Sequence, residues 1–147
     1  MKSNPPRYDK PKTHGRGMKY IIDGAPIPLA RPRFGNGRTY DTQASQKNDC
    51  RANLVACRGR AEPLNGPIHM DVVFYMPIPK SLSSVKQKNL DQKPHHVKPD
   101  LSNLIKFIED CANEICFGDD ATISSITARK IYDDFPRTEL TLTEIVL

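Results

Sequence analysis

No tryptophan occurs among the 147 residues of this sequence, and its other aromatic residues are limited to five phenylalanines and five tyrosines. Domains that bind RNA or single-stranded DNA stack successive bases on aromatic side chains arranged in recognisable motifs. The sequence contains no such motif. A basic domain that binds RNA or single strands is therefore the weakest of the functions that we consider.

Long apolar runs are also missing. The sequence has no stretch of roughly eighteen or more apolar residues that would cross a membrane, and its N-terminus lacks the apolar segment of a secretory signal. Because these apolar segments are missing, we expect a soluble, intracellular protein without membrane contact. The sequence also has no visible internal repeat.

The sequence has few cysteines, and their spacing does not match that of a zinc-binding motif. The four cysteines, at positions 50, 57, 111 and 116, form no Cys-x-x-Cys pair. Structural zinc sites usually take their ligands from such pairs. A zinc site remains the alternative, but we expect reduced, packed thiols.

Positive charge exceeds negative charge along the chain. The formal net charge is +5 and the isoelectric point is about 9.1, which favours an anionic partner. Residues 1–17 hold five basic residues and a single acid among prolines and glycines. We predict a flexible basic arm over residues 1–17 and one domain over residues 18–147.

Three arginines lie in a segment rich in glycine and proline. Because a guanidinium group can bind phosphate through two hydrogen bonds, we predict that Arg31, Arg33 and Arg38 contact the phosphate backbone of a nucleic-acid partner. The alternative is a solubilising loop. His95 and His96, in a loop rich in lysine and proline, are considered only as further DNA contacts.

Apolar periodicity and turn residues predict an α+β domain. The expected sheet is mostly antiparallel or mixed and is covered by at least two helices. We expect a Gly35-Asn36-Gly37 turn within an extended, proline-punctuated segment over residues 26–38, and residues 122–132 and 138–146 as an antiparallel pair joined by a turn at residues 133–137. The other expected elements are strands at 18–24, 38–40 and 68–76 and helices from 41 or 42 to 58, at 81–90 and from 100 to about 115.

The most informative segment runs from Lys98 to Lys106. Asp100 can cap a helix whose apolar side chains form one broad stripe, with Asn103 and Lys106 on the flank beside it. Asp119 and Asp120 follow the expected helix end, where Gly118 can take a left-handed conformation.

These acids suggest a divalent-metal site that acts on a phosphodiester. Mg²⁺ prefers oxygen ligands and keeps several waters, so Asp100, Asp119 and Asp120 would suffice if they converge. Lys106 would contact the phosphate. The competing interpretation treats Asp100 as a helix cap, the doublet as turn acids and Lys106 as a solvated residue.

At these residues the chain resembles the RusA-type Holliday junction resolvases, particularly their phage-borne branch. The segment Lys98-Pro-Asp-Leu-Ser-Asn-Leu-Ile-Lys106 and the later Asp119-Asp-Ala-Thr-Ile123 follow the family pattern, which usually has aspartate where Ser102 stands. Residues 26–34 and 76–81 also agree, in the family's order.

The resemblance implies a homodimeric, Mg²⁺-dependent endodeoxyribonuclease, with Mn²⁺ as a further possible metal, that cuts four-way junctions in DNA recombination and repair. It would act in the cytoplasm of a bacterium or of a phage-infected host. The implied catalytic residues are Asp100, Asp120 and Lys106; Asp100, Asp119 and Asp120 would hold the metal with Ser102 as a weak ligand, and Lys98 and Asn103 would contact DNA.

Ser102 leaves a second function open. A serine hydroxyl binds Mg²⁺ more weakly than a carboxylate and cannot act as a general base. The alternative to an active nuclease is therefore a protein that binds junctions but is catalytically weakened.

Overall fold

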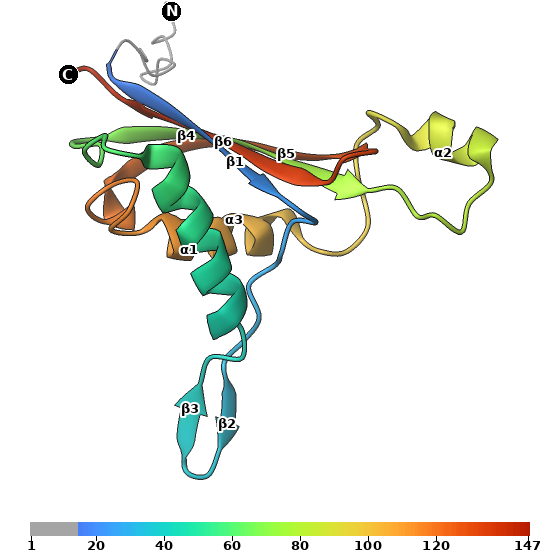
Figure 1. The fold of residues 1–147 in the computed structure, drawn as a ribbon, viewed down its shortest axis with the longest axis horizontal. Helices are drawn as coiled ribbons and strands as arrows, with labels where there is room; N and C mark the ends of the chain where they lie inside the picture. Colours follow the sequence, from blue (N-terminus) through green and yellow to red (C-terminus); the bar gives the residue numbers. More distant parts are fainter. Residues whose placement is uncertain (1–14) are drawn as a thin grey trace, which may run out of the picture.

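The fold is centred on a four-stranded mixed sheet (Figure 1). A computed structural model of the chain describes residues 15–147, so most of the predicted basic arm lies outside the described residues. The strand order is β1-β6-β4-β5, and β4 pairs antiparallel with β6 but parallel with β5. The strands are β1 (Gly17–Asp23), β4 (Ile68–Pro77), β5 (Ile123–Asp133) and β6 (Arg137–Glu144).

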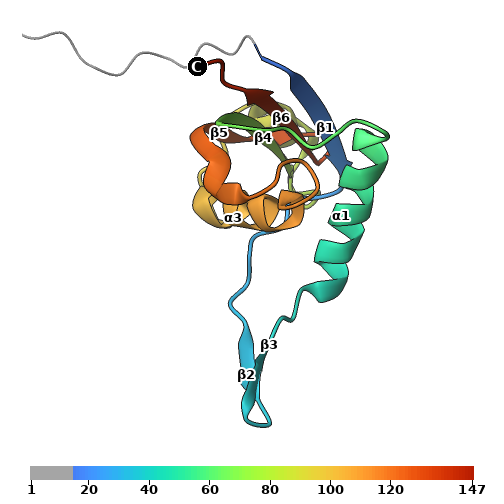
Figure 2. The same cartoon turned by 90° about the vertical axis from the view of Figure 1, so that its left-hand side faces the viewer.

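Two helices cover one face of this sheet (Figure 2). They are α1 (Ala44–Arg58) and α3 (Leu101–Ala112). Because side chains alternate along a strand, Met70, Val72 and Phe74 of β4 all point into this covered face, where they are buried. They pack with residues such as Leu54 of α1 and Leu104 of α3 in one continuous core. The predicted α+β class is confirmed, whereas the homodimer stays a prediction.

The parallel pair β4 and β5 is joined by a long crossover that contains α2 (Ser84–Leu90) and α3. The loop between these helices lies along the outer edge of β5, where His95 N–H donates to the Lys130 carbonyl at 3.0 Å and Tyr132 N–H donates to the Lys93 carbonyl at 3.0 Å. These bonds occupy part of the strand edge. They also fix the path of the chain as it approaches the start of α3.

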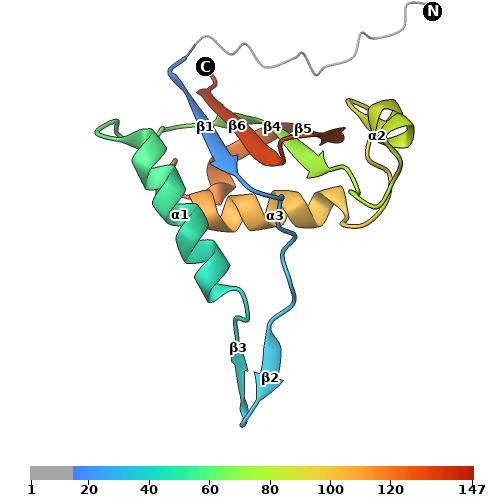
Figure 3. The same cartoon turned by 45° about the vertical axis from the view of Figure 1, so that its right-hand side comes forward.

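A short hairpin projects away from the sheet and helices (Figures 1 and 3). It consists of β2 (Arg33–Gly35) and β3 (Arg38–Tyr40). Asn36 and Gly37 both have positive φ, 52° and 76°, as a tight hairpin turn of the mirror-image type requires. The predicted turn and returning strand are confirmed.

The predicted pairing of the last two strands is wrong. β5 and β6 do not pair with each other, because β4 lies between them and bonds to both: Val72 is opposite Leu140 of β6 and Ala128 of β5. A short connection of residues 134–136 passes the end of β4. The predicted turn is present, but the strand that lies between β5 and β6 comes from much earlier in the chain.

The helix ends also differ from prediction. α3 stops at Ala112 instead of about residue 115, and Glu114, with φ of 68°, takes the left-handed conformation expected of Gly118. The early stop turns the chain so that Cys116 and Phe117 enter the core. α1 begins at Ala44, with Gln43 as its N-cap, two or three residues later than predicted. α2 begins at Ser84, with Ser83 as its N-cap, three residues later than predicted.

Candidate metal and nucleic-acid site

Asp100 holds the N-cap position of α3, but its carboxylate does not cap the helix. The carboxylate makes no hydrogen bond to a helix N–H; instead Oδ1 accepts from Lys98 Nζ at 3.0 Å. Its side chain is 51% exposed, and that of Lys98 is 86% exposed. An exposed ion pair of this kind contributes little to stability. The carboxylate therefore has no structural task that would prevent it from binding a ligand.

A lysine of the sheet positions the segment before Asp100. Lys130 Nζ, from β5, donates to the backbone carbonyls of Val97 and Pro99. The neighbouring His95 is buried against Tyr132, with ring centroids 4.7 Å apart. Burial, and then the charge of Lys130, lowers the pKa of His95. The expectation that His95 contacts DNA is therefore wrong, whereas His96 is exposed.

A groove of about 560 Å³ lies beside Asp100. Asn103 lines it together with Lys98, and Met76 and Pro77 at the end of β4 form part of its wall. The Asn103 carbonyl accepts the N–H of Leu29 at 2.9 Å, which ties the segment leading to the hairpin to the first turn of α3. The structure thus brings Lys98, Asp100 and Asn103 together and attaches the basic segment next to them.

The acidic doublet lies at the start of a short 3₁₀ turn, η1 (Asp120–Thr122). Asp119 accepts the N–H of Ala121 at 3.3 Å, and the Asp120 N–H donates to Oδ1 of Asn113 at 3.1 Å. The Ala121 N–H, followed by the neighbouring Asp120 carboxyl group, lowers the pKa of Asp119, and the Asp119 carboxyl group is the main cause of the raised pKa of Asp120. Two adjacent exposed carboxylates repel each other, and a cation bound between them would relieve that repulsion.

Glu109 lies close enough to the doublet to feel the charge of Asp120. Partial burial raises its pKa first, and the negative charges of Asp120 and Asp110 raise it further. Asp110 itself is paired with Lys47, whose Nζ lies 3.6 Å from its Oδ2. The sequence spacing is consistent with this position. Glu109 stands four residues before Asn113, so the two share a helix face, and Asn113 binds the backbone of Asp120.

The doublet and Asp100 lie at opposite ends of α3. Asp100 precedes the helix, whereas Asn113, which binds Asp120, follows its twelve residues. At a rise of 1.5 Å per residue these ends are about 20 Å apart. The prediction that Asp100 and Asp120 converge within one chain is wrong, because the doublet faces the end of the helix rather than its start. Among residues 15–147, no three His, Cys, Asp or Glu side chains are grouped closely enough to hold a metal ion.

A polar stripe along α3 connects the two acidic ends. Ser102, Lys106, Glu109 and Asn113 repeat at intervals of three or four residues, which places them on one helix face. Lys106 is exposed and projects from the side opposite the buried Leu104 and Ile108. This polar stripe faces away from the core.

The predicted backbone-binding arginines are all exposed. Arg33 and Arg38 lie in the hairpin strands, and Arg31 lies in the segment that leads into them. None of these three forms an ion pair with another residue of the part of the chain described here. Their guanidinium groups are available to an anionic partner.

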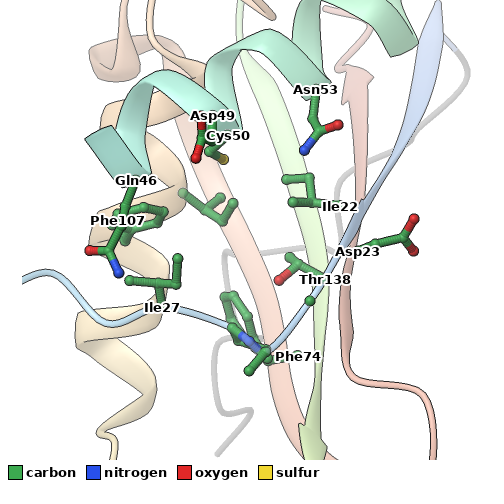
Figure 4. Close-up of a pocket in the computed structure, with 14 residues that line it drawn as sticks. Ile22, Asp23, Ile27, Gln46, Asp49, Cys50, Asn53, Phe74, Phe107 and Thr138 are labelled. Atoms are coloured by element: carbon green, nitrogen blue, oxygen red, sulfur yellow. The ribbon is translucent and has the colours of Figure 1, made fainter. Parts of the chain in front are cut away.

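A separate cavity of about 310 Å³ lies between α1 and the sheet (Figure 4). Phe74 and Phe107 contribute to its apolar wall, and Gln46, Asp49 and Asn53 of α1 add polar groups. None of the acids at the ends of α3 lines it. Cys50, which borders it, is buried, as are Cys111 and Cys116, and the four cysteines are unbridged. The expectation of packed thiols is met by these three cysteines, whereas Cys57 is exposed.

These observations describe a small basic α+β domain with carboxylates at both ends of one helix and an arginine-bearing hairpin, as suits a protein that handles nucleic acid. The profile of Endodeoxyribonuclease RusA matches residues 23–143, and the chain therefore belongs to the RusA endodeoxyribonuclease family. This confirms the resemblance. The matched range contains Asp100, Asp119, Asp120 and all three arginines.

Two relatives illustrate the range of the family. The chain is 31% identical over 137 residues to the uncharacterized protein YqaN of Bacillus subtilis strain 168, covering 87% of this chain and 96% of that protein. It is 26% identical over 113 residues to the crossover junction endodeoxyribonuclease RusA of Lactococcus phage r1t, covering 76% and 81% respectively. Within residues 15–147, no helix is long and apolar enough to span a bilayer.

Proposed function

We propose that this protein is a Mg²⁺-dependent endonuclease that resolves four-way DNA junctions in recombination and repair, and that it works as a homodimer with each site shared between two protomers. One observation carries the proposal. The family match spans both acidic motifs, yet α3 holds those motifs about 20 Å apart. A cation that needs ligands from both motifs must therefore receive them from two chains.

A twofold axis between two protomers would bring the two acidic motifs together. If the polar stripes of two α3 helices pack antiparallel, Asp100 and Ser102 of one protomer approach Glu109 and Asp120 of the other, and the same contact recurs at the opposite end. The dimer would then contain two identical sites. Paired cuts in two symmetry-related strands of a junction require that arrangement.

The donor atoms suit Mg²⁺, and Mn²⁺ would also be accepted. The residues that would hold the metal are Asp119 and Asp120, with Glu109 beside them, and Asp100 with Ser102 as a weak ligand from the other protomer. The adjacency of the two exposed carboxyl groups, with Asp119 as the main cause of the raised pKa of Asp120, supports a cation position at the doublet. Bound there, the metal would supply activated water and neutralise charge on the scissile phosphate.

The other side chains have binding and orienting tasks in this proposal. Lys106, at the middle of the polar stripe, contacts the phosphate electrostatically. The hairpin arginines, with Lys98 and Asn103 beside the groove, hold the backbone of branched double-stranded DNA. Such contacts position the substrate without reading its sequence, as selection of a DNA shape requires.

The direct test compares a synthetic four-way junction with a linear duplex of the same sequence. In Mg²⁺ we expect paired nicks near the branch point of the junction, no cleavage of the duplex and no cleavage in EDTA. Equal cleavage of duplex and junction would contradict selectivity. Tight junction binding without any cleavage would instead favour the second function, a weakened binding protein, for which the exposed Ser102 is the motivating observation.

Ser102→Asp separates these two functions. An added carboxylate strengthens the ligand set, so we expect half-maximal cleavage at a Mg²⁺ concentration lower by roughly tenfold or more. The measurement is junction cleavage as a function of Mg²⁺ concentration. Ser45→Asp adds the same charge at an exposed position of α1 and should change nothing. An unaltered Mg²⁺ dependence in Ser102→Asp would show that residue 102 does not face the metal.

A further inference from the structure

Phe34 is a large apolar side chain at the end of a projecting arm, and neither the core nor the acidic ends of α3 account for it. Phe34 is 76% exposed. The hairpin of β2 and β3, which carries Phe34, extends away from the sheet and helices (Figure 3). Single exposed apolar residues are common, but Phe34 stands in an arm whose strands also carry Arg33 and Arg38.

The two faces of the hairpin differ in chemistry. Arg33 pairs with Tyr40, Phe34 with Thr39 and Gly35 with Arg38. Because side chains alternate, Arg33, Arg38 and Tyr40 share one face, and Phe34 stands on the other with Thr39. The ring of Tyr40 lies over Gly35, where an added Cβ would come within 3.2 Å of it. Tyr40 therefore packs on the backbone of the basic face, whereas Phe34 is left largely exposed.

The arm is fixed in direction relative to α3. Oε1 of Gln43 accepts a hydrogen bond from the Ala30 N–H at 2.8 Å, and Nε2 of Gln43 donates to the Pro28 carbonyl at 2.9 Å. The Leu29 N–H reaches the carbonyl of Asn103, in the first turn of α3. These bonds anchor the base of the arm close to Asp100. A strand of DNA held at Asp100 would thus lie within reach of the hairpin.

We propose that Phe34 stacks on an unpaired or unstacked base at the branch point of junction DNA while the arginine face holds the adjoining backbone; this rests on the proposed function. Base pairs at a branch point are the easiest to unstack, and an inserted apolar ring substitutes for the lost stacking partner. Charge favours DNA over a second copy of this chain. Residues 33–40 contain two arginines and no acid, so pairing two such arms would bring like charges together.

The test uses the full-length protein in EDTA, which prevents cleavage, with 2-aminopurine at the branch point of a four-way junction. We expect wild type to change the probe's fluorescence and Phe34→Ala to lose that change. Junction affinity of Phe34→Ala should fall by about 5- to 150-fold, with little effect on duplex affinity. Phe34→Trp should retain both signals. Phe135→Ala, which removes a ring of the same 76% exposure in the turn before β6, is the matched control.

The outcomes separate the inference from the proposed function. If wild type prefers junction to duplex but Phe34→Ala matches it in fluorescence and affinity, the stacking role is wrong and the proposed function stands. If wild type shows no preference for the junction, both are wrong. If Phe34→Ala instead shifts the sedimentation of the free protein from dimer to monomer, the ring faces a second copy and the stacking role is overturned.

Discussion

Replacing Asp120 by asparagine should reduce junction cleavage by about a thousandfold or more while leaving junction affinity within a few-fold of wild type. The substitution keeps the size of the side chain and the backbone bond to Asn113 but removes a negative charge from the doublet. A metal ligand contributes to charge neutralisation at the scissile phosphate, whereas DNA affinity depends mainly on the basic residues. Cleavage under single-turnover conditions, with affinity measured in EDTA, distinguishes the two effects.

Asp71→Asn is the control for this prediction. Asp71 is an exposed aspartate of β4, away from both ends of α3, so its replacement removes the same charge elsewhere on the surface. Cleavage by Asp71→Asn should equal that of wild type. Undiminished cleavage by Asp120→Asn would remove the doublet from the chemistry. Loss of junction binding together with cleavage would indicate a structural effect instead.

Leu104→Ala should lower the free energy of unfolding by about 2–5 kcal/mol. Leu104 is fully buried on the inner face of α3 and belongs to the main core cluster. Its truncation leaves a cavity between α3 and the sheet, one turn from Asp100. Urea denaturation followed by circular dichroism measures the change.

Val85→Ala provides the comparison. Val85 is 69% exposed on α2, and its truncation should change the unfolding free energy by less than about 0.5 kcal/mol. A loss below about 1 kcal/mol for Leu104→Ala would show that the inner face of α3 is not tightly packed. The position assigned to the polar stripe, which depends on that packing, would then be wrong as well.

Local features were predictable because short-range chemistry determines them. The Asn36-Gly37 turn supplies two positive φ angles, and that preference alone predicts the hairpin. The amphipathic pattern around Leu104 and Ile108 likewise predicts which face of α3 is buried. Neither prediction required knowledge of a distant partner.

Features that depend on distant segments were not predictable. β4 separates β5 from β6 although nothing in the Asp133–Arg137 turn indicates an intervening strand. His95 is buried because Tyr132, on another element, provides the surface for it. The sequence locates the two acidic motifs, but their separation follows from the length of α3, which lies between them, and their meeting across two protomers is the proposal made above.

The most direct test of the shared site mixes two inactive variants, Asp100→Asn and Asp120→Asn, and allows their subunits to exchange. In a mixed dimer with shared sites, one site carries both substitutions and the other carries none. Half of the dimers then hold one intact site, so we expect about a quarter of the wild-type site activity, seen as single nicks. Mixing Asp119→Asn with Asp120→Asn is the control. Both substitutions lie at the same end of α3, so every site in the mixed dimer carries one of the two substitutions and no site is intact.

The outcome decides where the metal ligands come from. Recovery of nicking in the first mixture but not in the control is the result that the structure predicts. A first mixture as inactive as its two parents, with subunit exchange verified, would show that Asp100 and Asp120 do not serve one cation across the dimer.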